Sequence, residues 1–184
     1  YGVGTRIESL SMIGMYALTA AITTFVAQNH GARNAERIKE SLRFVTKAAL
    51  VWGAVIAVLV FAASGLIARI FNDDAEVVSM TTSYLRIVPL SYAPFAVAIG
   101  VAAMLNALDL PLKATGLAAI RLLVLAIPLA WLGSALYELT GVFFGIVAAN
   151  LIMGLIAGVY ARQKIWGLGA ALERATPTAV APAE

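Results

Sequence analysis

Residues 9–32 read SLSMIGMYALTAAITTFVAQNHGA, a run of 24 residues without a formally charged side chain. A helix needs roughly 20 apolar residues to cross a hydrocarbon core of about 30 Å, so this run predicts a membrane-spanning helix. Four more uncharged stretches follow, at 48–68, 87–108, 122–137 and 139–161. We therefore expect an all-α membrane protein with five transmembrane helices.

The composition of the whole chain agrees with a membrane protein. Of 184 residues, 61% are hydrophobic and 12% are charged, and the mean hydropathy is +0.90. A soluble domain carries about 25% charged residues, so this chain has too few charges to cover a soluble surface. It also has no cysteine, which excludes disulfides and thiolate metal sites.

The charged residues that separate the apolar stretches give the expected organisation of the chain. Residues 1–165 form one membrane lobe, 30–44 within it form a cytoplasmic amphipathic loop, and the Ala/Pro-rich residues 166–184 form a disordered cytoplasmic tail. Trp166 is expected at the inner membrane interface, where the tail begins. The expected helices cover about 3–29, 45–71, 78–108, 114–136 and 139–163.

The basic residues predict the orientation. Assigning alternate connections to the cytoplasm puts ten Lys and Arg inside and three outside, in keeping with the positive-inside rule. The N-terminal end is then outside and the C-terminal end inside. Because the chain starts outside and without Met, we expect it to be the C-terminal part of a larger protein.

Enzymatic chemistry is not indicated. The sequence shows no nucleophile motif, phosphate-binding loop or metal-ligand cluster, and its single histidine, His30, falls at an expected inner helix end. The GVG at 2–4 and the GLG at 167–169 lack the strand-to-helix context of a dinucleotide site. We expect a protein that is not an enzyme and that binds neither a metal nor nucleic acid.

The first helix carries a polar stripe. At 100° per residue, six of its residues fall within about 80° of one another. They are Thr5, Ser9, Met12, Tyr16, Thr19 and Thr23. One interpretation is close helix packing with Ser and Thr hydrogen bonds between helices. The other is the wall of a substrate cavity. Tyr92, in the third helix, is a further cavity candidate.

Glu8 borders this stripe, whereas Arg6 lies on the other side of the helix. Residues i and i+2 of a helix do not face each other, so the two charges cannot neutralise each other directly. Arg69 and Arg86, expected at the same outer level, are the candidate partners of Glu8. We predict that Glu8 belongs to the cavity and that Arg6 anchors the outer helix end.

Other polar groups and prolines are expected to be structural or to act as hinges. Proline removes a backbone hydrogen bond and bends a transmembrane helix unless neighbours compensate. Small residues at Gly141-x-x-x-Gly145 and Gly154-x-x-x-Gly158 predict close helix contacts. The residues in the structural or hinge group are Arg6, Pro89, Pro94, Asn106, Arg121, Pro128 and Asn150.

Three segments resemble the multidrug and toxic compound extrusion (MATE) family. YGVGTRIESLSM at 1–12 with FVAQNHGARNAER at 25–37 resembles the start of its eighth helix and the loop that follows. LNALDLPLKATGLAAIRLLVLAIPLAWLG at 105–133 is similar to its connection between helices ten and eleven, and TGVFFGIVAANLIMG at 140–154 to its last helix. The resemblance identifies the five expected helices with helices 8–12 of twelve.

This resemblance implies a secondary active antiporter in a bacterial inner or archaeal cell membrane. Such a protein exports drugs or lipophilic organic cations in exchange for Na⁺ or H⁺, by alternating access of two six-helix lobes. Its partners would be the lipid bilayer, a small-molecule substrate and the missing amino-terminal lobe. No organic cofactor is implied.

The resemblance also bears on the coupling ion. Some members hold a coupling carboxylate within the tenth helix, but here no Asp or Glu lies between Glu76 and Asp109. This absence favours the DinF-like branch, in which the coupling Asp lies in the other lobe. Two alternatives stay open. One is a related lipid or polysaccharide flippase, and the other is a non-transporting membrane scaffold or inactive gene fragment.

Overall fold

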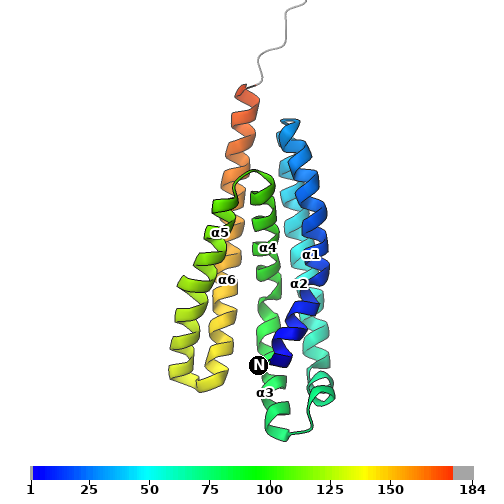
Figure 1. Cartoon of the computed structure of the whole chain (residues 1–184), viewed down its shortest axis with the longest axis vertical. Coiled ribbons are helices and arrows are strands. Elements are labelled where there is room, and N and C mark those ends of the chain that lie inside the picture. Colours follow the sequence, from blue (N-terminus) through cyan, green and yellow to red (C-terminus); the bar gives the residue numbers. More distant parts are fainter. Residues whose placement is uncertain (1, 176–184) are drawn as a thin grey trace, which may run out of the picture.

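The structure is a computed structural model that describes residues 2–175, with side chains described for 2–164 and 167. Long helices lie side by side, nearly parallel to one another (Figure 1). In chain order the elements are α1 (Gly2–Gly31), α2 (Ala35–Phe71), α3 (Ala75–Ile87), the 3₁₀ turn η1 (Val88–Ser91), α4 (Tyr92–Ala107), α5 (Pro111–Ala119), the π-helical η2 (Ile120–Ala126) and α6 (Ile127–Ala175).

Within the described residues, four helical segments are long and apolar enough to cross a membrane. They are Gly2–Gly31, Ala35–Phe71, Ala75–Ala107 and Pro111–Lys164. Large apolar side chains such as Leu155 and Val58 remain about 70% exposed on the outside of the bundle, as they would be where lipid replaces water. The all-α membrane fold is thus confirmed, while the number of crossings and their orientation stay predictions.

The fourth segment contains a reversal of the chain. Tyr137 (φ −139°, ψ 28°) and Glu138 (φ 50°, ψ −134°) leave the helical conformation, and the limb that follows runs back beside α5 (Figure 1). A Cβ at Gly141 would overlap the Gly133 carbonyl, and one at Gly145 would overlap that of Leu129. The first pair of small residues therefore allows the two limbs to touch, as its spacing predicts.

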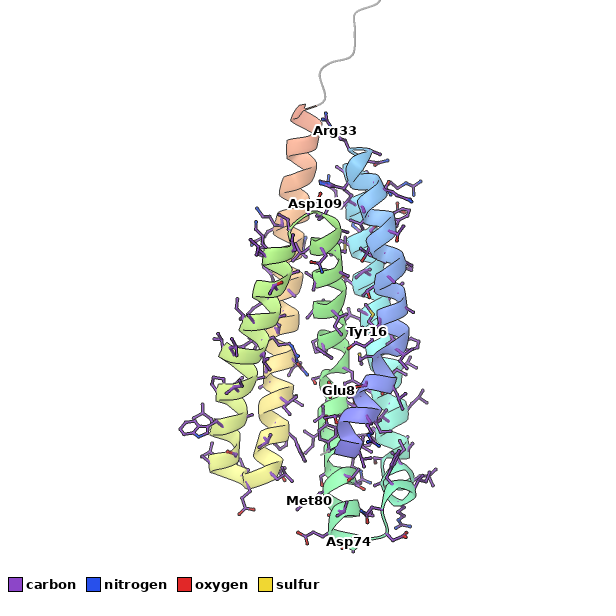
Figure 2. The ribbon with its side chains drawn as sticks, viewed as in Figure 1. Glu8, Tyr16, Arg33, Asp74, Met80 and Asp109 are labelled. Carbon is purple, nitrogen blue, oxygen red and sulfur yellow. The ribbon has the colours of Figure 1, made fainter. Side chains whose placement is uncertain are left out.

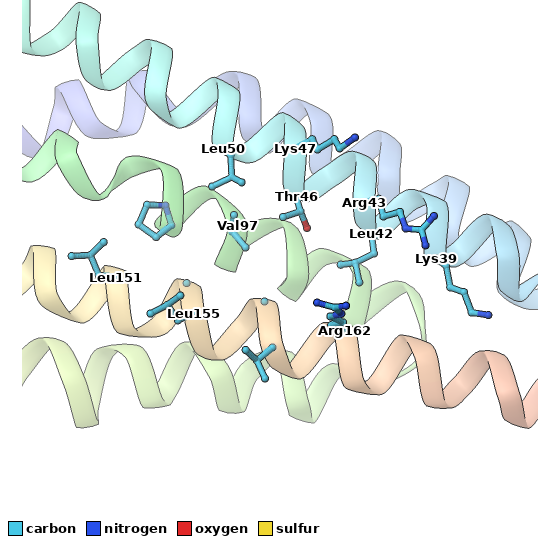
Figure 3. Close-up of a pocket in the computed structure, with 14 residues that line it drawn as sticks. Lys39, Leu42, Arg43, Thr46, Lys47, Leu50, Val97, Leu151, Leu155 and Arg162 are labelled. Atoms are coloured by element: carbon cyan, nitrogen blue, oxygen red, sulfur yellow. The ribbon is translucent and has the colours of Figure 1, made fainter.

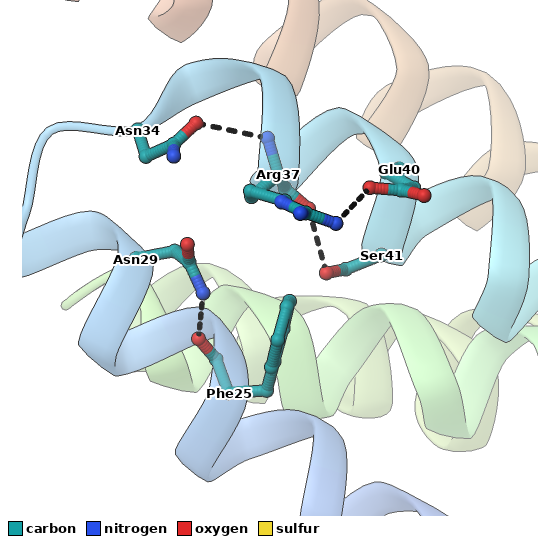
Figure 4. A network of polar contacts seen from close by, with 6 residues as sticks. All are labelled: Phe25, Asn29, Asn34, Arg37, Glu40 and Ser41. Atoms are coloured by element: carbon teal, nitrogen blue, oxygen red, sulfur yellow. Dashed lines mark hydrogen bonds and ion pairs between the residues drawn. The ribbon is translucent and has the colours of Figure 1, made fainter.

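The turn between α1 and α2 is shorter than expected. α2 begins at Ala35, so most of the segment expected as a loop at 30–44 is the first part of a helix. The Asn34 side chain caps it by accepting a 3.2 Å hydrogen bond from the Arg37 backbone N–H, and Arg37 pairs with Glu40 at 3.0 Å (Figure 4). Ile38 and Leu42 bury the other face of the same turns. The charges there mark the solvated face of a capped amphipathic helix.

Each proline of the hinge group lies within three residues of a departure from regular α-helix. Pro89 lies in η1, and Pro94 lies in the first turn of α4, where no intrahelical N–H is needed. Pro128 directly follows η2. A proline ring clashes with the carbonyl four residues earlier and donates nothing to it. Widening the preceding turns to π-helix relieves that conflict.

Candidate functional site

The polar stripe of α1 runs along the border between its buried and its open faces. Met12 is fully buried, whereas Tyr16 is 49% exposed and Ser9 is exposed. The remaining stripe residues, Thr5, Thr19 and Thr23, are half-buried. α2 covers a different side, because Trp52 donates its Nε1–H to the Ser11 carbonyl at 2.9 Å and its ring lies against Gly14.

The Ser and Thr hydroxyls of the stripe bond within α1 itself. Each donates to a carbonyl three or four residues earlier: Thr5 to Gly2 at 3.0 Å, Ser9 to Thr5 at 2.9 Å, Thr19 to Tyr16 at 2.7 Å and Thr23 to Thr19 at 2.7 Å. Among the described residues, these donors therefore do not connect α1 to another helix. A hydroxyl that donates one hydrogen bond can still accept another through its oxygen.

Glu8 receives a hydrogen bond from a partner that sequence reasoning missed. The Tyr84 hydroxyl of α3 donates to Glu8 Oε2 at 2.9 Å. The Tyr84 ring meets Phe143 of α6 edge-on, with 5.1 Å between the ring centroids. Glu8 and Tyr16 lie on the same stretch of α1 (Figure 2). The carboxylate is thus held half-buried, by a neutral donor, at the edge of the stripe.

Arg86, one of the two cations considered as a partner of Glu8, makes other contacts. Its Nε donates to Ser64 Oγ of α2 at 3.3 Å, and its guanidinium carbon lies 5.9 Å from the centroid of the Phe61 ring. No described salt bridge joins Glu8 to either arginine. Arg6 is exposed, and its role as an anchor of the outer helix end stays a prediction.

Tyr92 lies inside the bundle rather than on the open face. It is fully buried, and within the described residues its hydroxyl has no hydrogen-bond partner. The hydroxyl of nearby Ser11 donates instead to the Ile7 carbonyl at 2.6 Å. A buried hydroxyl without a partner is unusual and costs stability.

A second polar cluster joins η1, η2 and α6. Arg121 Nη1 donates to Asn150 Oδ1 at 3.1 Å, and Asn150 Nδ2 donates to Ser91 Oγ at 3.0 Å. Ser91 in turn donates to the Val88 carbonyl at 2.8 Å. The Arg121 guanidinium also lies 4.7 Å above the Phe95 ring, a distance suited to a cation–π contact. The cluster fastens the segments in which the prolines interrupt the helices.

The remaining residues named in the sequence analysis lie at a helix end or outside the described part of the chain. Asn106 is exposed at the end of α4, where its carbonyl accepts from the Asp109 N–H at 3.2 Å. The Trp166 side chain and the tail residues 176–184 lie outside the described part of the chain. Among the described residues, no group of three His, Cys, Asp or Glu side chains is placed to hold a metal ion.

Comparison with known proteins assigns the family. The model of the MatE family matches residues 1–132, nearly three quarters of the chain. The chain belongs to the MatE family. It is therefore part of a multi-pass membrane protein of the multidrug and toxic compound extrusion family, as the resemblance of its three segments predicted.

Individual relatives agree with this assignment. The chain is 35% identical over 166 residues to a protein named FAD transporter from Shewanella oneidensis, and 27% identical over 157 residues to the multidrug export protein MepA of Staphylococcus saprophyticus. These two alignments cover 90% and 85% of this chain and 36% and 34% of the relatives. The relatives are transporters rather than enzymes. The chain thus spans about a third of the length of the curated relatives it matches.

Solved structures agree on the fold. The chain superposes on the MATE transporter VcmN of Vibrio cholerae, in its bent form, with a TM-score of 0.88 at 23% identity. The superposition covers 92% of this chain and 39% of VcmN. The bundle is therefore a MATE transporter fold over the part of the molecule that this chain represents.

Proposed function

We propose that the full-length protein containing this chain is an antiporter. It exports drugs or lipophilic organic cations in exchange for Na⁺ or H⁺, by alternating access of two lobes. This chain supplies part of the carboxy-terminal lobe. The observation that carries the proposal is the half-buried Glu8 carboxylate beside the open polar border of α1, in a chain of the MatE family.

The chemistry of that border suits a lipophilic cation. Ionisable groups at membrane depth are costly, and they mark substrate or ion pathways. Glu8 supplies a negative charge, the stripe hydroxyls supply lone pairs, and exposed Tyr16 supplies an aromatic face for a cation–π contact. No Lys or Arg lies between Arg6 and the inner end of α1, so nothing on this helix repels a cation along the stripe.

Coupling is proposed to occur outside this chain. The segment Val77–Leu108, which contains most of α3 and all of η1 and α4, has no Asp or Glu. A carboxylate site for Na⁺ or H⁺ within that helix is therefore disfavoured. We place the coupling site in the amino-terminal lobe and expect no organic cofactor to take part.

A second candidate substrate follows from the relatives. The relative that is 35% identical is named a transporter of FAD. FAD is an anionic dinucleotide with a pyrophosphate, so its site would require cationic groups. The Glu8 side of α1 does not offer them, because Arg6 lies on the other side of the helix. The lipid or polysaccharide flippase alternative meets the same difficulty at this surface.

One experiment separates these substrates. The full-length protein is expressed in cells that lack their own efflux pumps, and the export of ethidium and of FAD is followed in parallel. The proposal predicts faster ethidium efflux than in cells with an empty vector, and no effect on FAD in the medium. Release of FAD without ethidium efflux would show that the substrate is the flavin dinucleotide and not the organic cation. If the protein changes neither ethidium efflux nor FAD release, export of both compounds is rejected.

A further inference from the structure

A groove away from the polar stripe of α1 supports a separate inference. It lies between α2 and α6, and Pro94 and Val97 of α4 also line it. Its volume is about 790 Å³. Four cationic side chains line it: Lys39, Arg43, Lys47 and Arg162. Of the fourteen described residues that line it, none is acidic.

Three of the four cations lie at one end of the groove, and apolar residues continue beyond them to the other end. Lys39, Arg43 and Arg162 gather towards one end, and Leu50 and Leu151 lie towards the other (Figure 3). Eleven positions separate Lys39 from Leu50 in α2, and eleven separate Leu151 from Arg162 in α6. At 1.5 Å per residue each distance is about 16 Å, which is close to half of a hydrocarbon core of about 30 Å. The groove therefore spans about one leaflet.

The charge pattern along α2 is suited to a bound anion. Lys39, Arg43 and Lys47 recur every four residues and so share one helix face. Lys39 also meets Glu36 at 3.7 Å, but the Glu36 side chain is 77% exposed and does not line the groove. Arg162 adds a fourth cation from the facing helix. Basic pockets between transmembrane helices at the cytoplasmic side are suited to anionic lipid headgroups.

The apolar half of the groove has room for an acyl chain. Gly158 lines it, and a Cβ built there would meet no described atom within 4 Å outside its own helix turn. By contrast, a Cβ at Gly154 would collide with Pro94 of α4. Only Gly154 of the second small-residue pair thus serves helix packing, while Gly158 borders open space.

We propose that this groove is a binding site for an anionic phospholipid of the leaflet that the positive-inside rule places on the cytoplasmic side. Its phosphate lies among Arg43, Arg162 and Lys39, and one acyl chain runs along Leu155 and Gly158 towards Leu151. The inference does not depend on what the full-length protein exports.

The test is native mass spectrometry of the purified full-length protein in detergent, with equal amounts of phosphatidylglycerol and phosphatidylcholine of the same acyl chains. Wild type is expected to retain phosphatidylglycerol selectively. The double variant Arg43→Gln/Arg162→Gln should lose roughly tenfold in phosphatidylglycerol binding, because two headgroup cations are removed. The control Arg37→Gln, on the same helix but outside the groove, should bind as wild type does.

A second variant tests the acyl-chain half independently of charge. Gly158→Leu fills the open space of the groove and should reduce lipid retention. The control Gly65→Leu also places a side chain in open space, but on α2 away from the groove, and should not reduce it. Equal binding of the two lipids to wild type, or unchanged selectivity in the double variant, overturns the proposal. So does displacement of the lipid by a large excess of inorganic phosphate, which would show a simple anion site.

Discussion

The hydroxyl of Tyr84 donates a 2.9 Å hydrogen bond to Oε2 of Glu8, across 76 positions of sequence and between α3 and α1. This bond sets the position of the carboxylate that borders the polar stripe. Its donor is neutral, so the negative charge of Glu8 is oriented without being cancelled. Under the proposed function, this charge attracts the cationic substrate at the open border of α1.

Removing the donor should destabilise the lobe through Glu8. We expect Tyr84→Phe to lower the stability of the full-length protein by about 1–3 kcal/mol, because the half-buried carboxylate loses its partner. Thermal unfolding in detergent measures this loss. In a Glu8→Gln background the same change should cost clearly less, since the two residues are coupled. Equal losses in both backgrounds would show that Tyr84 acts through its packing alone.

Neutralising the carboxylate should reduce transport. Glu8→Gln keeps the size of the side chain and its ability to accept from Tyr84, but removes the charge that attracts a cation. We expect at least a severalfold slower efflux of ethidium from cells that express the full-length variant. Arg6→Gln, on the exposed opposite side of α1, is the matched control and should transport as wild type does. Wild-type efflux by Glu8→Gln at normal membrane abundance would remove Glu8 from the mechanism.

A bulky apolar residue on the stripe should change substrate preference. Thr19→Leu places a branched apolar side chain on the half-buried border of α1, where it would alter the shape of the proposed substrate cavity. The measurement is the ratio of efflux rates for several cations of different size. Thr24→Leu, at an exposed position off the stripe, should leave this ratio unchanged. An unchanged ratio for Thr19→Leu would favour the packing interpretation of the stripe.

The buried hydroxyl of Tyr92 offers a test that separates stability from transport. Because the hydroxyl has no partner within the described residues, Tyr92→Phe should leave the melting temperature unchanged or raise it. If the hydroxyl serves transport, efflux falls while stability is kept. A clear drop in melting temperature would instead reveal a hydrogen-bond partner of Tyr92 in the full-length protein.

The Arg121–Asn150–Ser91 cluster should be necessary for stability. Asn150→Leu removes the acceptor of a part-buried guanidinium and should cost about 1.5–3 kcal/mol, the range for hydrogen bonds to charged groups. Adding Arg121→Met should recover part of the loss, because the unpaired charge is then gone. Thermal unfolding of the single and double variants checks both. Full stability of Asn150→Leu would contradict the structural role of the cluster.

Local spacing predicted the features of this lobe that depend on one helix. Runs without charge located the apolar helices, and the 100° rotation per residue placed Glu8 and Arg6 on different sides of α1. The start of α2 was placed ten residues too late, because residues 30–44 were assigned to an amphipathic loop ahead of the membrane crossing. In the structure those charges pair along a helix that Asn34 caps.

Features that join distant residues could not be read from spacing. No local pattern connects Tyr84 to Glu8 or Asn150 to Arg121, because those pairs depend on how the helices are packed together. Pro128 indicated a bend, but not the π-helical turns by which the chain accommodates it. Gly158 shared the small-residue pattern of Gly154, yet only the facing Pro94 distinguishes a packed glycine from one beside open space.

Transport by the purified full-length protein in lipid vesicles tests the central claim most directly. Ethidium movement is recorded after a Na⁺ or H⁺ gradient is imposed in either direction. Antiport predicts that ethidium accumulates against its own gradient when the ion moves the opposite way, and that dissipating the ion gradient abolishes this accumulation. If ethidium moves at the same rate whether or not a Na⁺ or H⁺ gradient is imposed, the account is contradicted.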